Sequence, residues 1–383
     1  MVVFRVLIGE QAASLPMDRY EAEQLLYDLG IDQPGAEYEM ELIDSDYLLV
    51  LDSNFRELNR LAQRIGQMGD YERETFDAWC EARHTRGVGH CEVAWENAPT
   101  GRILTHLCTV EEALLASYNL NRAEFYPGVD SDEQLAEVAL DSEEYADLPE
   151  ETFALLDYAK VGARMRERDG GVFANGGYLL AEPMEGLDYP QEKPLPLFQV
   201  RFNNGQEESA WVDVPLPEAD ADVLINSFGP ENFHGLKMDC RSSIPPLSGL
   251  VSGSDELPEL CLLDKALNGM DGDETQKYRA LLEAARPGTV SDALRLAGEM
   301  GDVTLEYADS AAYGLQHAAY RYSLDADCPL LDYVDLAGYG AAMLLEDGYT
   351  QTRYGAVYTE DMELGEAMAE EQAQGFGGMG GLA

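Results

Sequence analysis

The residues in this sequence that could do chemistry are overwhelmingly carboxylates. The 383-residue chain contains 73 Asp and Glu against 25 Lys and Arg, which gives a formal net charge of −48 at pH 7. Carboxylates can act as acids and bases, ligate metal ions, or bind basic surfaces of other macromolecules. Because self-repulsion on this scale opposes a compact state, so large a net charge indicates that the charge itself has a function.

The negative charge is distributed over the whole chain. Residues 1–190 carry 39 acidic and 14 basic side chains, and residues 191–383 carry 34 and 11. Both halves are therefore polyanions. Direct binding to nucleic acid is disfavoured because the long-range field repels phosphates, so we expect the partner to be a protein with a basic surface. We expect no membrane partner.

The candidate binding residues are carboxylates that cluster on expected helices and in the segments beside them. In the first half they form three groups: Asp70, Glu72, Glu74 and Asp77; Asp130, Asp132, Glu133 and Glu137; and Glu143, Glu144, Asp147, Glu150 and Glu151. In the second half they are Asp271, Asp273, Glu274, Asp302, Glu306, Asp309, Asp325 and Asp327. Each one alone is explained equally well as a solvated surface residue, so the interpretation depends on the pattern.

No catalytic motif accompanies these carboxylates. The sequence contains no Walker A loop, no Gly-x-Ser-x-Gly elbow and no His-Glu-x-x-His motif. Residues 375–380 fit Gly-x-Gly-x-x-Gly, but we expect neither a strand before them nor a helix after them. We therefore expect a protein that is not an enzyme and uses no cofactor.

A metal site is an alternative that the cysteines and histidines raise. Half of the cysteines and three of the five histidines fall in one stretch: Cys80, His84, His90, Cys91, His106 and Cys108. Structural zinc sites use four closely spaced ligands, and no Cys-x-x-Cys pair is present. Asp130 and Asp132 begin like a calcium loop, but no complete EF-hand pattern follows. We expect no metal, and a metal-binding acidic interaction protein stays an alternative.

The composition predicts a folded protein. Acid-rich disordered chains lack aromatic and branched residues, whereas this chain is 45% hydrophobic with 21 Tyr and 11 Phe. It has no run of 18 apolar residues, and its apolar start resembles a strand more than a signal peptide. Unpaired, scattered cysteines favour a cytoplasmic location. Adaptation to high salt would also give an acidic, lysine-poor surface, but the six cysteines, 13 methionines and repeated motifs argue against it.

The elements that must position the carboxylates follow from the hydrophobic pattern. Alternation predicts strands, and a 3.6-residue period predicts helices. In the first half we expect strands at 2–9, 36–43 and 122–126 and a strand-like hairpin at 170–180. We expect helices at 19–29, 54–66, 70–83, 110–118, 132–140 and 158–168.

Three blocks of sequence recur in the same order in the two halves. The matching pairs are residues 58–82 with 260–284, 109–114 with 289–294, and 155–158 with 330–333. We interpret them as a tandem duplication of one α+β unit, with antiparallel strands and packed helices in several small α/β subdomains. The predicted organisation is a first repeat with subdomains 1–83 and 84–181, a proline-rich linker 182–196, a second repeat with subdomains 197–286 and 287–360, and an acidic, then glycine-rich tail 361–383.

Several motifs of the first repeat resemble the ArdA antirestriction proteins, which are acidic DNA mimics carried on mobile elements. The matching segments are residues 57–62, 70–78, 124–129, 132–135, 148–150, 156–162 and 171–178. The resemblance spans most of the first copy; the second copy keeps the spacing but lacks the Tyr-Pro-Gly turn of residues 126–128. It implies an elongated α+β protein that binds type I restriction-modification enzymes in place of DNA.

The net charge can be compared with that of duplex DNA independently of the resemblance. Duplex DNA carries one charge per ~1.7 Å of axis, so 48 surplus charges correspond to roughly 80 Å of duplex. Carboxylates on a rigid scaffold would occupy the phosphate sites of a DNA-binding groove without offering bases to read. An acidic inhibitor or scaffold for another DNA-binding defence complex is the alternative. The chain could act as a homodimer or as a monomeric pseudo-dimer.

Overall fold

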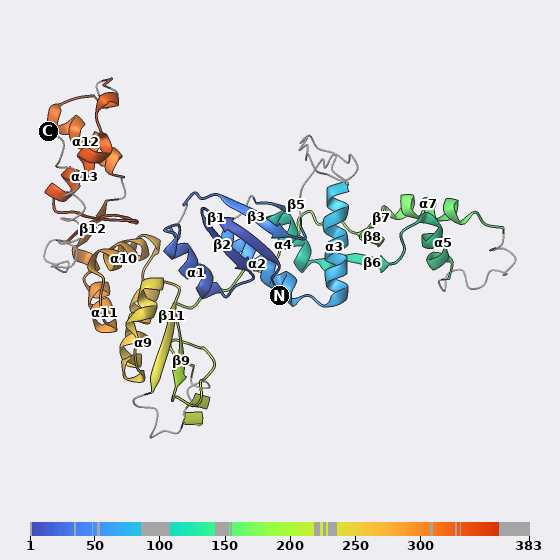
Figure 1. Cartoon of the computed structure of the whole chain (residues 1–383), viewed down its shortest axis with the longest axis horizontal. Helices are drawn as coiled ribbons and strands as arrows, with labels where there is room; N and C mark the ends of the chain where they lie inside the picture. Colours follow the sequence, from blue (N-terminus) through green and yellow to red (C-terminus); the bar gives the residue numbers. More distant parts are fainter. Residues whose placement is uncertain are drawn as a thin grey trace. The chain divides into compact units, whose positions relative to one another are not determined.

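The computed structural model describes most of the chain (Figure 1): residues 2–33, 36–47, 49–51, 54–85, 108–141, 153, 155–217, 223–224, 227–228, 236–306, 309–325, 328–329 and 331–359. The chain forms two compact units. The first combines residues 1–18 with residues 37–193, and the second combines residues 19–36 with the chain from residue 194 onward. Residues 19–36, which we placed in the first subdomain of the first repeat, thus cluster with the second unit.

The first unit begins with a three-stranded antiparallel sheet. Its strands, in the order β2-β1-β3, are β1 (Phe4–Ile8), β2 (Gln11–Leu15) and β3 (Met40–Ser45). The alternation in β1 buries Phe4, Val6 and Ile8, as a strand with one face toward a core requires. Helix α2 (Phe55–Gln67) starts at the N-cap Asn54, whose side chain accepts the Glu57 N–H.

The middle of the first unit is helical. Its elements are the long helix α3 (Asp70–Thr85), the shorter α4 (Val110–Tyr118), the 3₁₀ turn η1 (Leu120–Arg122) and a short parallel pair, β4 (Leu49–Val50) with β5 (Cys108–Thr109). Thr109 and Glu112 form a capping box at the start of α4. Leu58 and Leu61 of α2 and Phe76 of α3 are fully buried, so α2 and α3 supply much of the unit's core.

The first unit ends with a second sheet and two helices that pack together. The sheet has the order β6-β8-β7, with β6 (Ala123–Pro127), β7 (Val172–Ala174) and β8 (Gly177–Ala181). The helices are α5 (Asp132–Leu140) and α7 (Tyr158–Asp169). A small core of Val129, Leu135, Met165 and Tyr178 joins helices to sheet. Gly128, with φ of +79°, turns the chain after β6 in a conformation that favours glycine.

The second unit repeats this order of elements. Its first sheet has the order β10-β9-β11, with β9 (Phe198–Asn203), β10 (Val212–Asp213) and β11 (Lys237–Ser242). Helix α1 (Arg19–Asp28) belongs to this unit, as do the 3₁₀ turns η3 (Pro245–Leu250), η4 (Ser254–Glu256) and η5 (Met300–Asp302) and the helices α9 (Leu257–Asn268), α10 (Gly272–Ala285) and α11 (Val290–Gly298).

A last sheet and helix pair complete the second unit. The elements are β12 (Val303–Glu306), α12 (Ser310–Tyr322), η6 (Leu331–Tyr333), α13 (Leu336–Glu346), β13 (Thr350–Thr352) and β14 (Gly355–Thr359). The sheet order β12-β14-β13 parallels β6-β8-β7. The fold is therefore mixed α/β, with several small antiparallel sheets packed with helices, as expected. Among the described residues, no helix is long and apolar enough to cross a membrane.

Small details also recur between the two units. Each first sheet pairs a phenylalanine with a serine in register, Phe4 with Ser45 and Phe198 with Ser242. Thr109 and Thr289 cap equivalent nine-residue helices, and a 3₁₀ turn followed by a strand comes after each. A duplication predicts this parallel order of elements, and the duplication remains our interpretation. The elongated arrangement also stays a prediction.

The structure shifts the third aligned block by three residues. Asp157 caps α7 through the Lys160 N–H, and its structural counterpart Asp335 caps α13 through the Gly338 N–H. We had matched Asp157 with Asp332, which lies in the turn η6. Within our interpretation of a duplication, the capping position is the better guide, because the cap that starts a helix is more constrained than a local Leu-Leu-Asp-Tyr similarity.

Candidate protein-binding acidic surface

The structure describes 15 of the 21 predicted carboxylates. Those that are exposed are Asp70, Glu74, Asp130, Glu133, Glu137, Asp271, Asp273, Glu274, Asp302, Asp309 and Asp325. Those that are partly buried are Glu72, Asp77, Asp132 and Glu306. The remaining six lie outside the described residues: Glu143, Glu144, Asp147, Glu150, Glu151 and Asp327.

On α3 the predicted carboxylates divide into two roles. Glu72 accepts hydrogen bonds from Arg64 Nη2 and from the Gly69 N–H, and the Arg64 bond above all lowers the pKa of Glu72. Asp77 accepts a 2.7 Å bond from the Tyr47 hydroxyl, and burial together with this bond raises the pKa of Tyr47. Asp70 and Glu74 are exposed and four residues apart, so they lie on one face of the helix.

On α5 one carboxylate builds the scaffold and its neighbours stay exposed. Arg166 of α7 donates to both oxygens of Asp132, from Nε at 2.8 Å and from Nη2 at 3.1 Å. This pair lowers the pKa of Asp132 and connects the two helices. Glu133 and Glu137 are exposed on α5, and Asp130 is exposed just before it. Glu133 and Glu137 therefore stand on a helix held in place by Asp132, and Asp130 lies beside its start.

In the second unit the predicted carboxylates mostly start helices. Asp271 and Glu274 form a capping box on α10, and Asp309 caps α12 through the Ala312 N–H. The oxygens that accept these backbone N–H groups are already engaged, although the side chains remain exposed. Asp273, Asp302 and Asp325 are exposed without such a role among the described residues.

The acidic helix α5 lies in the longest base-free acidic stretch that we find in the first half of the chain. Between Arg122 and Lys160 there is no Lys, Arg or His. The same stretch contains twelve acidic residues: Glu124, Asp130, Asp132, Glu133, Glu137, Asp141, Glu143, Glu144, Asp147, Glu150, Glu151 and Asp157. Within it, the hydrogen bond from Tyr126 to Glu124 is the main reason that the pKa of Tyr126 rises to about 12. No cation within the segment neutralises its charge.

Several arginines, by contrast, are stacked against aromatic rings of the same chain. The Arg60 guanidinium lies 5.3 Å from the Tyr118 ring centre and 4.8 Å from that of Tyr189. Arg241 lies 4.6 Å from the Tyr20 ring centre and 4.5 Å from that of Trp211. Cations held in this way contribute to the fold while the surplus of carboxylates remains at the surface.

One buried carboxylate was not among the predicted residues. Asp32 is 4% exposed, and its Oδ2 accepts bonds from the Tyr354 hydroxyl at 2.6 Å and from Arg279 Nη1 at 2.9 Å. Burial and the hydrogen bond to Asp32 raise the pKa of Tyr354. Asp32 thus anchors residues 19–36 within the second unit. Its partners are more than 240 positions away in sequence, so no local pattern could have identified it.

Two of the six residues considered for metal binding meet in the first unit. Cys80 and Cys108 are buried free thiols, and the hydrogen bond between them, with burial, raises the pKa of Cys80 well above its usual range. His90, Cys91 and His106, and the side chain of His84, lie outside the described residues. Where the structure describes the chain, no group of three or more His, Cys, Asp or Glu is placed to hold a metal ion.

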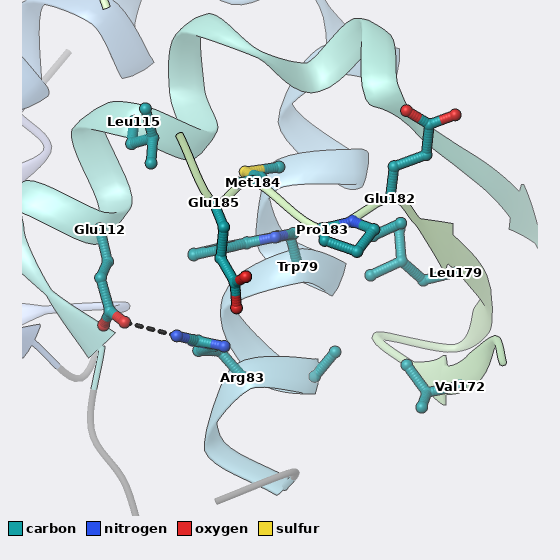
Figure 2. A pocket seen from close by; sticks show the side chains of 12 residues that line it. Trp79, Arg83, Glu112, Leu115, Val172, Leu179, Glu182, Pro183, Met184 and Glu185 are labelled. Carbon is teal, nitrogen blue, oxygen red and sulfur yellow. Dashed lines mark hydrogen bonds and ion pairs between the residues drawn. The ribbon is translucent and has the colours of Figure 1, made fainter. Parts of the chain in front are cut away.

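The first unit also contains a pocket of about 360 Å³ that sequence reasoning missed (Figure 2). Trp79 and Arg83 of α3, Glu112 and Leu115 of α4, and strands β7 and β8 line it, and residues 182–185 cover one side. Arg83 Nη2 lies 2.6 Å from Glu112 Oε1. The pocket joins elements that are more than 100 residues apart, so only the fold brings them together.

Comparisons with protein-family models, with curated proteins and with solved structures found no match to this chain. The resemblance to the ArdA proteins therefore depends on the sequence segments quoted above.

Proposed function

We propose that this chain is a DNA-mimic antirestriction protein that occupies the DNA-binding groove of type I restriction-modification enzymes. The observation that carries the proposal is the acidic stretch without Lys, Arg or His between Arg122 and Lys160. Within it, Asp130, Glu133 and Glu137 are exposed on and beside α5, the helix that the Asp132–Arg166 pair connects to α7. In this proposal the chain has no catalytic activity and works in the cytoplasm, where its target acts.

The spacing of the carboxylates supports the proposal physically. One turn of α-helix advances 5.4 Å, so Glu133 and Glu137 are about 6 Å apart along the axis. One strand of duplex DNA carries a charge every ~3.4 Å of axis, so two neighbouring rows of carboxylates would approach the density of one DNA strand. When the basic residues of a DNA-binding groove contact phosphates, the counterions around the DNA are released. Contacts between the same basic residues and these carboxylates would release counterions in the same way.

The rigidity of the scaffold supports it as well. The bidentate Asp132–Arg166 pair and the close packing of α5 on α7 fix the helix before any partner arrives. A preorganised array loses less conformational entropy on binding than a flexible acidic tail would. Shape, in addition to charge, would then separate this protein from an ordinary polyanion.

Inhibition of a purified type I enzyme tests the proposal. We expect the folded protein to block ATP-dependent DNA cleavage at concentrations near that of the enzyme. The matched control is a poly-glutamate chain of about the same charge, which should inhibit only at much higher concentration because it lacks the fixed geometry. Equal inhibition by both polyanions, or no inhibition by the folded protein, would contradict the proposal.

Another DNA-binding defence complex is the second candidate target, since the same carboxylates suit any basic groove. A panel of DNA-binding defence enzymes in the cleavage assay separates these targets. Whether two chains associate, or one chain acts as a pseudo-dimer, is checked by sedimentation. We expect a single-chain particle if the two repeats replace two subunits, and a stable two-chain particle would count against that.

A further inference from the structure

The pocket between α3, α4 and the sheet of β7 and β8 has the chemistry of a cation site. Its lining carries three carboxylates, Glu112, Glu182 and Glu185, against the single cation Arg83. The Trp79 indole and the side chains of Leu115, Val172, Leu179 and Met184 supply an apolar surface. An occupant with an apolar stem and a positive end would satisfy both parts of this lining.

Two of the three carboxylates are already occupied. Glu112 accepts the Thr109 N–H and pairs with Arg83 at 2.6 Å. Glu182 pairs with Arg122 at 2.8 Å. Glu185 is exposed and has no polar partner among the described residues, and Figure 2 shows its carboxylate with the Trp79 indole near the centre of the lining. The lining thus offers one uncommitted carboxylate and one aromatic ring.

The rest of the molecule shows which cation such a pair holds. Arg60 is stacked against Tyr118 and Tyr189, and Arg241 against Tyr20 and Trp211. Arg201 lies 5.0 Å from the Trp211 ring centre while its guanidinium pairs with Asp239 at 2.7 Å. Arg353 likewise lies 4.4 Å from the Tyr27 ring centre and 3.1 Å from Glu283 Oε2, so Arg201 and Arg353 show a guanidinium held by an aromatic ring together with a carboxylate.

We propose that this pocket binds an arginine side chain of the partner protein, with the guanidinium between Glu185 and Trp79. The assignment of the arginine to a target enzyme rests on the proposed function, because a DNA-binding groove presents arginines that would otherwise contact phosphates. The volume, at the lower end of the range for ligand pockets, suits one long side chain. The pocket would add one contact of fixed geometry to a surface that otherwise binds the partner through many separate carboxylates.

The binding step is tested with two short peptides on the full chain. One is acetyl-Gly-Arg-Gly-amide, and the other replaces arginine by citrulline, which has nearly the same shape without the charge. The readout is the indole N–H resonance of Trp79, assigned with the Trp79→Phe variant, at 0.15 M salt, where the screening length is about 8 Å. We expect the arginine peptide to move this resonance and the citrulline peptide to leave it in place.

Two glutamate variants locate the site. Glu185→Gln should weaken binding of the arginine peptide about fivefold, because a charge-assisted hydrogen bond is lost. Glu167→Gln, which removes an exposed carboxylate of α7 that has no place in the proposed binding surface, should leave it unchanged. Equal shifts with arginine and citrulline peptides, or equal losses in both variants, would overturn the site.

The partner assignment has its own readout. In the cleavage assay Glu185→Gln should raise the concentration for half-inhibition about fivefold, and Glu167→Gln should leave it nearly unchanged. If Glu185→Gln binds the peptide weakly but inhibits like the unmodified chain, the partner assignment fails while the proposed function stands. If the chain never inhibits, the proposed function fails, and the peptide experiment still decides whether the pocket binds arginine.

Discussion

The helix pairs α5–α7 and α12–α13 hold equivalent places in the two units and share one scaffold with different surfaces. A Cβ on Gly162 of α7 would lie 1.7 Å from the Asp132 carbonyl oxygen, and one on Gly340 of α13 would lie 1.6 Å from that of Ser310. In both pairs, therefore, the two helices approach most closely where a glycine of one helix meets the first residue of the other. The glycine that allows the close approach is common to the two pairs, whereas the residue that it meets differs, Asp132 in one and Ser310 in the other.

The difference in charge lies in the first helix of each pair and the segments beside it, because α7 itself is basic, with Lys160, Arg164, Arg166 and Arg168 against Glu167 and Asp169. Residues 123–159 contain twelve acidic residues and no basic one, whereas the equivalent residues 301–337 contain seven acidic residues with Arg321 and His317. Helix α12 has no carboxylate, and α13 has only Glu346 at its last position. Tyr320 and Tyr333, each 88% exposed, stand in this second region. Because α12 and α13 pack without carboxylates, the fold does not require the exposed carboxylates of α5.

Reversing the charge of the exposed carboxylates on and beside α5 should have the largest effect on enzyme binding. We expect the triple variant Asp130→Lys, Glu133→Lys, Glu137→Lys to bind a type I enzyme about a thousandfold more weakly, roughly 4 kcal/mol, because attraction becomes like-charge repulsion. The matched control is Asp302→Lys, Asp325→Lys, Glu346→Lys in the second unit, for which we expect a much smaller loss. Binding is measured by fluorescence anisotropy, with circular dichroism to establish folding. Equal losses would mean that the acidic surface of α5 has no special role.

Removing a buried carboxylate should separate folding from binding. Asp32→Ala leaves Arg279 and the Tyr354 hydroxyl without their shared partner, and we expect a loss of about 3 kcal/mol in the free energy of unfolding. Denaturant unfolding measures it. Enzyme binding by the folded fraction should stay within a factor of two, since Asp32 is not at the surface. A stable variant would show that this contact does not anchor residues 19–36.

The shared glycine crossing can be tested in both units. Gly162→Ala and Gly340→Ala should each cost about 2 kcal/mol, because the added methyl overlaps a backbone carbonyl. Gly69→Ala is the control, since nothing lies within 4 Å of its added Cβ. Hydrogen exchange of the amides in each helix pair gives the local stability. If only one of the two glycines is sensitive, the crossings are not equivalent.

Acidification should have the smallest effect, through the Asp132–Arg166 pair. The pKa of Asp132 is lowered in the folded state, so its contribution to stability is present above the unfolded pKa and is lost as the pH falls through the folded one. We expect less than about 1 kcal/mol, because the pair is partly exposed. The stability difference between the unmodified chain and Asp132→Asn should shrink between pH 6 and pH 3. A difference that does not change with pH would assign Asp132 a role other than its charge.

Local signals in the sequence predicted much of the fold. The helices expected at 132–140 and 110–118 have those bounds in the structure. The break between α2 and α3 falls at Met68 and Gly69, and a second glycine, Gly66, lies in the last turn of α2. Each of these features depends on residues within one turn of one another, which is the range that periodicity and capping can report.

Non-local features could not be predicted in the same way. The sequence pattern gave no reason for Asp32 to be buried against Arg279, nor for Trp79 and Glu185 to line one pocket. Of the predicted carboxylates, Glu72, Asp77 and Asp132 serve internal contacts, and Asp271, Glu274 and Asp309 cap helices. Composition gives the number of carboxylates, and only the packing divides them into those that build the fold and those that remain exposed.

The measurement that tests the central claim most directly is the binding of fluorescently labelled protein to a type I enzyme across a salt series, with unlabelled duplex DNA as competitor. We predict binding that the duplex displaces fully and that weakens at least a hundredfold between 50 and 200 mM salt, as for contacts to several phosphates. Binding that is insensitive to salt, or that persists when the enzyme is saturated with DNA, would contradict mimicry.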